Sequence, residues 1–284
     1  MKRRYEHPKV EKLAVPQRGD EIKQFTRNDA RAVRHPSHNF TYSASLRQEA
    51  AAEQNDVIAL PMNEGRPSTN KTIGDLKWGN EAEIGLSRKV FRWFDMALRL
   101  FPTVRYFAKA DDDTFLRVPQ YLLDLRTLPR RGVYWGLRTD ATARKNNVIH
   151  EFHYFSGMLY TLARDVVQQL VSFEPVRRLV DLPYNKEREG QFLYYNMQHE
   201  DVMVGQILRL EVRDSTLVVV EDSGCRFHSG RGKNRTLHVT PASLALHLPP
   251  VKGYSTLMEL GGHSKRDIYK LWKCCARHML RFVC

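Results

Sequence analysis

Apolar positions along the chain change from irregular to periodic, and one long stretch has the period of a helix. Between Asn80 and Phe101 apolar residues recur about every 3.6 positions, and they are Leu86, Val90, Phe94, Ala97, Leu98 and Phe101. We therefore expect a helix that lays one face on a core. Asn80 is its expected N-cap, because Glu83 follows at the position that completes a capping pair.

Shorter patterns predict an alternation of strands and helices. Runs of β-branched and aromatic residues predict strands or extended segments at 57–60, 104–108, 133–135, 155–162 and 216–220. Helical patterns occur at 46–54, 119–127, 164–173 and 201–210. The segment 61–78 is rich in Asn, Gly, Pro and Thr and is expected to be a loop. Strands that alternate with helices are typical of an α/β layered domain.

The two ends of the chain differ from the middle. Residues 1–44 are polar and basic with little periodicity, which predicts a mobile arm. Residues 45–260 carry the alternating pattern and are expected to form one folded domain. Residues 261–284 form a basic, cysteine-containing tail that could be a helix with one face made of Ile268, Leu271, Trp272 and Cys275.

The composition limits the classes of binding partner to expect. Hydrophobic residues make up 42% of the chain, enough to bury a core, and 45 Lys+Arg against 32 Asp+Glu give a net charge of +13. This charge favours nucleic acid, an acidic membrane surface or a phosphorylated small molecule, unless the basic ends serve only solubility. Nucleic acid is disfavoured, because RNP-like aromatics, zinc-finger spacing and a helix-turn-helix pattern are missing from the sequence. No run approaches the length of a spanning helix, and the first residues lack the apolar core of a secretory signal.

Cysteines and glycosylation sequons indicate the cellular compartment in which the protein folds. The cysteines all lie in the last quarter of the chain, at Cys225, Cys274, Cys275 and Cys284. No two are spaced as Cys-x-x-Cys, so a zinc ribbon has little support, whereas their even number permits disulfides. Sequons begin at Asn39, Asn70 and Asn234, which mildly favours a secretory lumen.

Three carboxylates stand side by side directly after the strand expected at 104–108. Asp111, Asp112 and Asp113 repel one another unless a positive group lies among them. Ligands bind beyond the carboxyl ends of strands in α/β sheets, and Asp111 and Asp113 can point to one side and share a divalent cation. The alternative interpretation is a solvated turn.

Two further groups of residues have candidate chemistry. Glu200 and Asp201 stand at the start of the helix expected at 201–210, where a carboxylate either caps the helix or acts as a general base. His228 follows the strand at 216–220. A lone histidine is usually structural, but an imidazole can complete a divalent-metal site together with carboxylates.

Taken together, these stretches make the chain resemble glycosyltransferase family 31, the UDP-sugar-dependent β-1,3-glycosyltransferases, and within it the kinetoplastid branch that uses UDP-Gal or UDP-GlcNAc. The resemblance runs from about Leu46 to Leu257. It rests on NEGRPSTNKT, on SRKVFRWFDMALRLFPTVRYFAKADDDTFLRVPQYLLDLRTLPRRGVYWG, on HYFSGMLYTLARDV, on EDVMVG and on FHSG.

The resemblance implies a single-domain fold of the GT-A nucleotide-diphospho-sugar transferase type, with a mixed central sheet flanked by helices. It implies a manganese-dependent hexosyltransferase in the Golgi, which moves galactose or N-acetylglucosamine from a UDP-sugar to a hydroxyl of a glycan or glycoprotein acceptor with inversion, forming a β-1,3 linkage. The family also has an N-terminal membrane anchor and a first nucleotide-binding strand that ends in a glycine turn. Residues 11–44 do not match that strand. A truncated, inactive relative is therefore the alternative.

The resemblance also assigns roles to individual residues. Asp113 and His228 would be the manganese ligands. Asp201 would be the catalytic base, and Glu200 beside it would orient the donor or the acceptor. The candidates for binding the UDP-sugar donor are Asp111, Asp112, Lys89, Tyr154 and Gly157.

Overall fold

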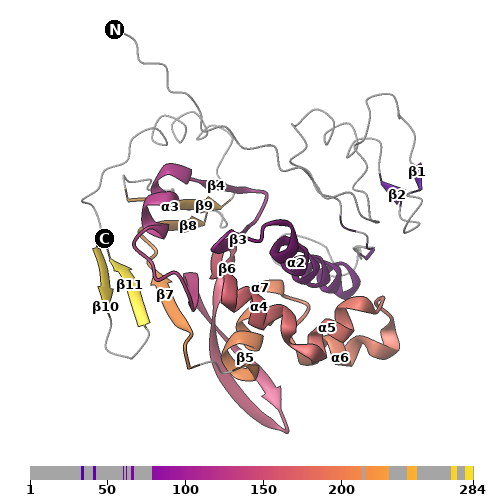
Figure 1. Cartoon of the computed structure of the whole chain (residues 1–284). Coiled ribbons are helices and arrows are strands. Elements are labelled where there is room, and N and C mark those ends of the chain that lie inside the picture. The colour runs from indigo at the N-terminus through magenta and orange to yellow at the C-terminus, as the bar shows by residue number, and fades with distance from the viewer. Residues whose placement is uncertain are drawn as a thin grey trace. The chain divides into compact units, whose positions relative to one another are not determined.

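The structure is a computed structural model, and it describes residues 33–34, 41–42, 60, 62, 65–66, 79–212, 215–229, 242–247, 270–273 and 279–283. The chain divides into two compact units, Met1–Met62 and Asn63–Cys284. In the first, β1 (Val33–Arg34) pairs antiparallel with β2 (Thr41–Tyr42). The predicted helix 46–54, strand 57–60 except Leu60, and the asparagines of the three sequons lie outside the described residues. Everything that follows concerns the second unit (Figure 1).

A six-stranded mixed sheet is the centre of the second unit. Its order is β10-β11-β7-β5-β6-β3. The pairs β11–β7 and β7–β5 are parallel, and the others are antiparallel. The strands are β3 (Tyr106–Ala110), β5 (Val133–Lys145), β6 (Val148–Ala163), β7 (Val218–Asp222), β10 (Lys270–Lys273) and β11 (Met279–Val283). The expectation of an α/β fold with a mixed sheet is confirmed.

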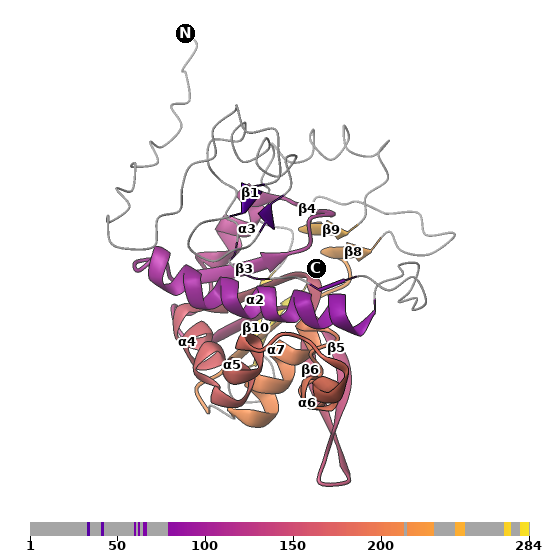
Figure 2. The same ribbon diagram turned by 90° about the vertical axis from the view of Figure 1, so that its right-hand side faces the viewer.

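Helices cover both faces of this sheet. Successive residues of β5 point to opposite faces. Tyr134 contacts Tyr160, and Phe94 of α2 packs on Tyr160 in turn. Trp135 on the other face stacks on Tyr121 of α3 with ring centroids 5.3 Å apart. Figure 2 looks onto the first layer, in which α2 lies above α4, α5 and α7. These helices are α2 (Asn80–Leu100), α3 (Val118–Leu125), α4 (Arg164–Ser172), α5 (Glu174–Asp181) and α7 (Glu200–Gln206).

Several short elements complete the unit, and of these only η2 falls mostly within a predicted helix, the one expected at 201–210. A second, three-stranded sheet has the order β4-β9-β8. Its strands are β4 (Thr114–Leu116), β8 (Phe227–Ser229) and β9 (Ala245–His247). The remaining helical segments are η1 (Lys186–Arg188), α6 (Glu189–Tyr194) and the π-helical turn η2 (Ile207–Glu211). Because β4 begins directly after the aspartate triplet, the strand that pairs with β4 determines which residues lie opposite these carboxylates.

Helix α2 confirms the periodic pattern, with two corrections. Its N-cap is Gly79, whose φ of 130° is readily adopted only by glycine, so the Asn80 prediction was one residue late. The Asn80 amide instead donates to Glu189 Oε1 at 2.8 Å. Leu86, expected on the buried face, is 36% exposed. Arg88 is buried because its Nε donates to the Val180 carbonyl at 3.0 Å.

The prediction of a C-terminal helix is wrong where the structure describes the tail. Leu271 and Trp272, which belong to the predicted helix, lie in β10 instead. β10 pairs antiparallel with β11. β11 in turn adds to β7 as a parallel neighbour. Phe282 is 1% exposed and packs on Trp135 with centroids 5.4 Å apart. This burial against a strand distant in sequence decides the conformation.

Candidate metal and carboxylate site

The aspartate triplet forms a tight turn at the end of β3. The Thr114 N–H donates to the Asp111 carbonyl at 3.1 Å, and the chain then reverses into β4. β4 pairs antiparallel with β9 so that Thr114 lies opposite His247. This register brings an imidazole from far along the sequence to the carboxylates of the turn.

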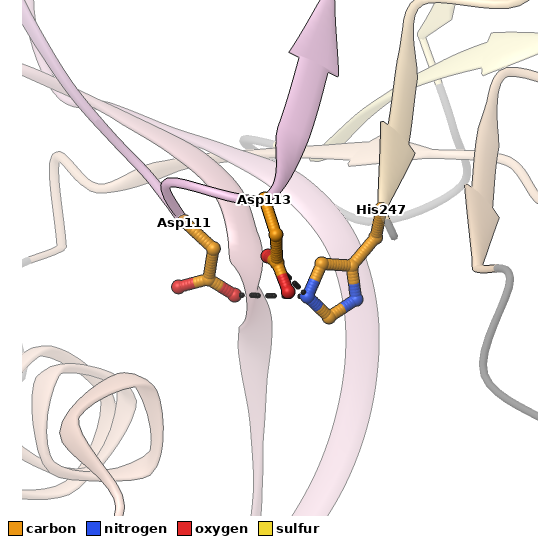
Figure 3. A group of neighbouring side chains, drawn as sticks. All are labelled: Asp111, Asp113 and His247. Carbon is orange, nitrogen blue, oxygen red and sulfur yellow. Dashed lines mark ion pairs between the residues drawn. The ribbon is translucent and has the colours of Figure 1, made fainter. Parts of the chain in front are cut away.

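Asp111, Asp113 and His247 form a group whose potential ligand atoms all lie within 4.8 Å of one another (Figure 3). His247 Nε2 is 3.0 Å from Asp113 Oδ1 and 3.4 Å from Asp111 Oδ2. Two ligands at right angles on an ion, each about 2.1 Å from it, lie about 3.0 Å apart. The observed distances match those of neighbouring ligands on one small divalent cation, and they are also the distances of a carboxylate–imidazole ion pair.

The polar atoms of this group also fit a cation. Asp113 Oδ1 and His247 Nε2 are buried, and the described part of the chain provides no well-formed hydrogen bond to either. These two atoms face each other at 3.0 Å, so a cation bound between them would replace a carboxylate–imidazole contact. Oxygen ligands suit Mg²⁺ and Mn²⁺, and an imidazole suits most first-row transition metals. Two carboxylates and one imidazole thus fit a divalent ion such as Mn²⁺.

A buried ionic network holds the strand that carries His247. The N–H groups of Leu244 and Ala245 donate to the Arg226 carbonyl at 2.7 and 3.1 Å. The Arg226 side chain is fully buried and forms ion pairs with Asp124 and Asp222. Backbone and side chain of one arginine therefore fix β9 against the core.

Lys109, two residues before Asp111, links the triplet to a second pair of carboxylates. Its Nζ is 2.5 Å from Asp111 Oδ1, 2.6 Å from Glu200 Oε1 and 2.8 Å from the Gly157 carbonyl. Burial lowers the pKa of Lys109, but the carboxylates of Glu200 and Asp111 outweigh it, so the pKa lies above its usual value. The ammonium is charged at neutral pH.

Glu200 and Asp201 stand side by side but differ in their surroundings. Glu200 is 5% exposed, pairs with Lys109 and accepts the Tyr160 hydroxyl at 2.9 Å. Burial raises its pKa to about 7, although Lys109 opposes this shift. Asp201 is held by backbone groups, the N–H of Gly157 at 2.8 Å and that of Val202 at 2.9 Å. Burial raises the pKa of Asp201 as well.

Two glycines permit these contacts. Gly157 lies where the register between β5 and β6 shifts, and irregular strands often redirect groups toward a site. A Cβ on Gly157 would be 3.0 Å from Glu200 Oε1 and 3.1 Å from Lys109 Nζ. A Cβ on Gly205 would be only 2.3 Å from the Cβ of Tyr154, so α7 lies directly on β6. Gly205 leaves no room for a side chain, and at Gly157 the ends of the neighbouring side chains would have to shift by a few tenths of an ångström.

The structure brings together most of the residues predicted for the site. Asp111 and Asp113 belong to the metal-type group, and Glu200, Asp201 and Gly157 surround Lys109. Asp112 lies in the same turn with an exposed side chain, Tyr154 packs under α7 at Gly205, and Lys89 lies on the exposed face of α2.

The histidine of the group is His247 and not His228. His228 lies on β8 opposite Leu246 of β9, and its Nε2 hydrogen-bonds to the Ser243 hydroxyl at 2.7 Å. Burial lowers the pKa of His228. His247 was not predicted from the sequence, because only the β4–β9 register reveals it. Lys109 was not predicted either, although a lysine two residues before an acidic triplet was a visible signal.

No protein-family model matches the chain, and no curated protein is significantly similar to it. Within the described residues, no helix is long and apolar enough to cross a membrane. Cys225 is engaged in a disulfide bond.

Proposed function

We propose that the chain is a metal-dependent, inverting hexosyltransferase with a GT-A-type fold, which transfers galactose or N-acetylglucosamine from a UDP-sugar to a glycan hydroxyl with a β-1,3 linkage. The observation that carries the proposal is the proximity of two acidic groups. A metal-type group and a pair of buried carboxylates are joined by Lys109, which lies 2.5 Å from Asp111 and 2.6 Å from Glu200. Such a reaction needs charge stabilisation and a general base in one site.

Asp111, Asp113 and His247 would hold the cation. When bound, a divalent ion supplies Lewis-acid assistance for the negative charge that develops on the departing diphosphate. Asp112, exposed in the same turn, is free to face the nucleotide side of the donor. His228 has no part in this assignment, because it bonds to Ser243.

Asp201 is the better base of the two neighbouring carboxylates. Both oxygens of Glu200 face side chains, those of Lys109 and Tyr160. Among the described residues, two backbone N–H groups donate to Asp201, and a carboxylate has further lone pairs for an acceptor hydroxyl. Its raised pKa brings it closer to neutral pH, where a general base contributes about 10²- to 10⁴-fold. Attack from the face opposite the leaving group converts an α-linked donor into a β-linked product.

The disulfide at Cys225 supports an oxidising compartment, because such bonds persist mainly in secretory environments. Together with the three sequons, it favours a Golgi lumen, where the acceptor would be a glycan or glycoprotein. Membrane association would come from the N-terminal anchor typical of the resembled family.

UDP release with Mn²⁺ and either UDP-Gal or UDP-GlcNAc tests the proposal. Asp113→Ala and His247→Ala should each lower the rate by about 10²-fold or more, as expected when charge stabilisation is lost. His228→Ala serves as the matched histidine variant and should have a much smaller effect. Equal UDP release from wild type and Asp113→Ala, or a rate independent of Mn²⁺, would refute the proposal.

A further inference from the structure

Lys109 lies where three segments of the chain meet. Its side chain is 11% exposed and contacts the turn after β3, the irregular part of β6 and the start of α7. An ammonium group has three N–H donors. Two acceptors receive hydrogen bonds from Lys109, Asp111 Oδ1 and the Gly157 carbonyl, and Glu200 Oε1 forms an ion pair with it at 2.6 Å.

The Gly157 peptide extends this connection to Asp201. Its carbonyl accepts from Lys109, and its N–H donates to Asp201 Oδ2 at 2.8 Å. A continuous series of contacts therefore runs from Asp111 through Lys109 and Gly157 to Asp201. We infer that Lys109 is a positioning residue that sets the spacing between the cation ligands and the base. This inference rests on the proposed function.

A simpler role, neutralising the buried charge of Glu200, leads to a different expectation. A buried ion pair can often be replaced by neutral side chains of similar volume without loss of stability. If neutralisation were the whole role, the double variant Lys109→Met with Glu200→Gln would match the single variant Glu200→Gln in stability and activity, so Glu200→Gln is measured beside it. If Lys109 positions the site, the double variant regains stability but not activity, because methionine donates no hydrogen bonds to Asp111 or to Gly157.

The positioning role of Lys109 also predicts the direction in which Mn²⁺ affinity changes when the lysine is removed. The ammonium shares Asp111 with the cation site, since it contacts Oδ1 while Oδ2 faces His247. Removing a positive charge next to a cation site strengthens the attraction for the cation. Loss of Lys109 should therefore leave Mn²⁺ affinity unchanged or increase it, whereas a variant that merely disrupts the site would weaken binding.

The experiment compares Lys109→Met, Lys109→Arg, the double variant and Lys186→Met. The last is a matched control, because Lys186 forms an ion pair with Glu189 but is 80% exposed. Four readouts are needed: Mn²⁺ affinity by electron paramagnetic resonance, kcat and KM for UDP release, melting temperature, and hydrogen exchange of the Gly157 and Val202 amides.

Lys109→Met should lower kcat by about 10²-fold, the effect of a misplaced group, with a smaller change in KM and no loss of Mn²⁺ affinity. The two amides that bind Asp201 should exchange faster in both methionine variants at position 109. Lys109→Arg should recover part of kcat, and Lys186→Met should resemble the wild type.

Recovery of kcat and of slow amide exchange in the double variant would overturn the inference, as would weaker Mn²⁺ binding in Lys109→Met. If the wild type neither binds Mn²⁺ nor releases UDP, the proposed function fails. In that case the amide exchange rates still decide whether Lys109 positions Asp201: unchanged exchange in Lys109→Met refutes it.

Discussion

Two buried cations, Arg226 and Lys109, each lie between two carboxylates, yet their surroundings differ. Arg226, Asp124 and Asp222 have side-chain exposures of 0%, 1% and 0%. Arg226 also lies 4.4 Å from the centroid of the Phe282 ring, and Asp222 accepts the Trp135 indole N–H at 3.0 Å. This network is closed on all sides by the core.

The Lys109 network is open at one end. Glu200 is 5% exposed on its side chain, but Asp111 is 30% exposed and also faces His247. A carboxylate that keeps an open side can accept a ligand, whereas one enclosed by protein can only support the fold. The same arrangement of charges is therefore structural around Arg226 and suited to a binding site around Lys109.

The largest expected loss of stability comes from breaking the closed network around Arg226. Arg226→Met leaves Asp124 and Asp222 buried without their cation, which should cost about 3–5 kcal/mol of unfolding free energy. Denaturant unfolding of wild type and variant measures the difference. A loss below about 1 kcal/mol would mean that the network behaves like a surface ion pair, and the contrast with Lys109 would disappear.

A pH titration tests the buried carboxylate that pairs with Lys109. Burial raises the pKa of Glu200 from 4.5 to about 7, so the folded protein holds this proton more tightly than the unfolded chain. The resulting stabilisation is complete below about pH 4.5 and is lost as the pH rises through about 7, a change of about 3 kcal/mol. Stability relative to Glu200→Gln should therefore fall over this range.

Glu189 provides a control of opposite sign. Hydrogen bonds from Lys186, Asn80 and Tyr184 lower its pKa to about 2. Its contribution is present above about pH 4.5 and is lost as the pH falls toward 2. Glu189→Gln should therefore lose its destabilising effect at low pH, and parallel profiles for Glu189→Gln and Glu200→Gln would contradict the assigned directions.

Addition of Mn²⁺ tests whether the open network around Lys109 adjoins a cation site. Mn²⁺ at 100 times its dissociation constant should stabilise the folded protein by about 2.7 kcal/mol, and a chelator should reverse the effect. Unfolding with and without Mn²⁺ measures it, and Asp95→Asn, on the half-exposed side of α2, is the carboxylate control outside the site. Stabilisation that persists in Asp113→Ala would place the ion elsewhere.

The smallest expected effect concerns an exposed ion pair. Arg99 and Asp95 are 2.9 Å apart on α2, with side-chain exposures of 72% and 35%. Arg99→Ala should change the unfolding free energy by about 0.3–0.5 kcal/mol, as measured by denaturant unfolding. A loss comparable to that of Arg226→Met would show that pairing rather than burial determines stability here.

Sequence patterns predicted the helices and strands that neighbouring residues along the chain determine. The 3.6-residue period revealed α2, and the alternation of short runs revealed the mixed α/β character. The long hairpin of β5 and β6 was only partly predicted, although Asn146 and Asn147 carried a usable signal. Both have positive φ, 48° and 62°, which matches a two-residue hairpin turn and is well tolerated by asparagine.

The missed features depend on contacts between segments far apart in sequence. β11 is a strand because β7 provides an open edge, so a helical reading of the tail could not be excluded from its own residues. His247 joins the aspartates through the register of β4 and β9, whereas His228 is one strand away. The chemistry of the carboxylates was readable in the sequence, but the identity of their histidine was not.

Direct Mn²⁺ binding, followed by electron paramagnetic resonance, is the most direct test of the central claim that Asp111, Asp113 and His247 form one cation site. The wild type and His228→Ala should bind one ion with similar affinity, and His247→Ala should weaken binding by about 10-fold or more, a loss of about 1.4 kcal/mol. Normal binding in His247→Ala, with loss in His228→Ala, would contradict the account.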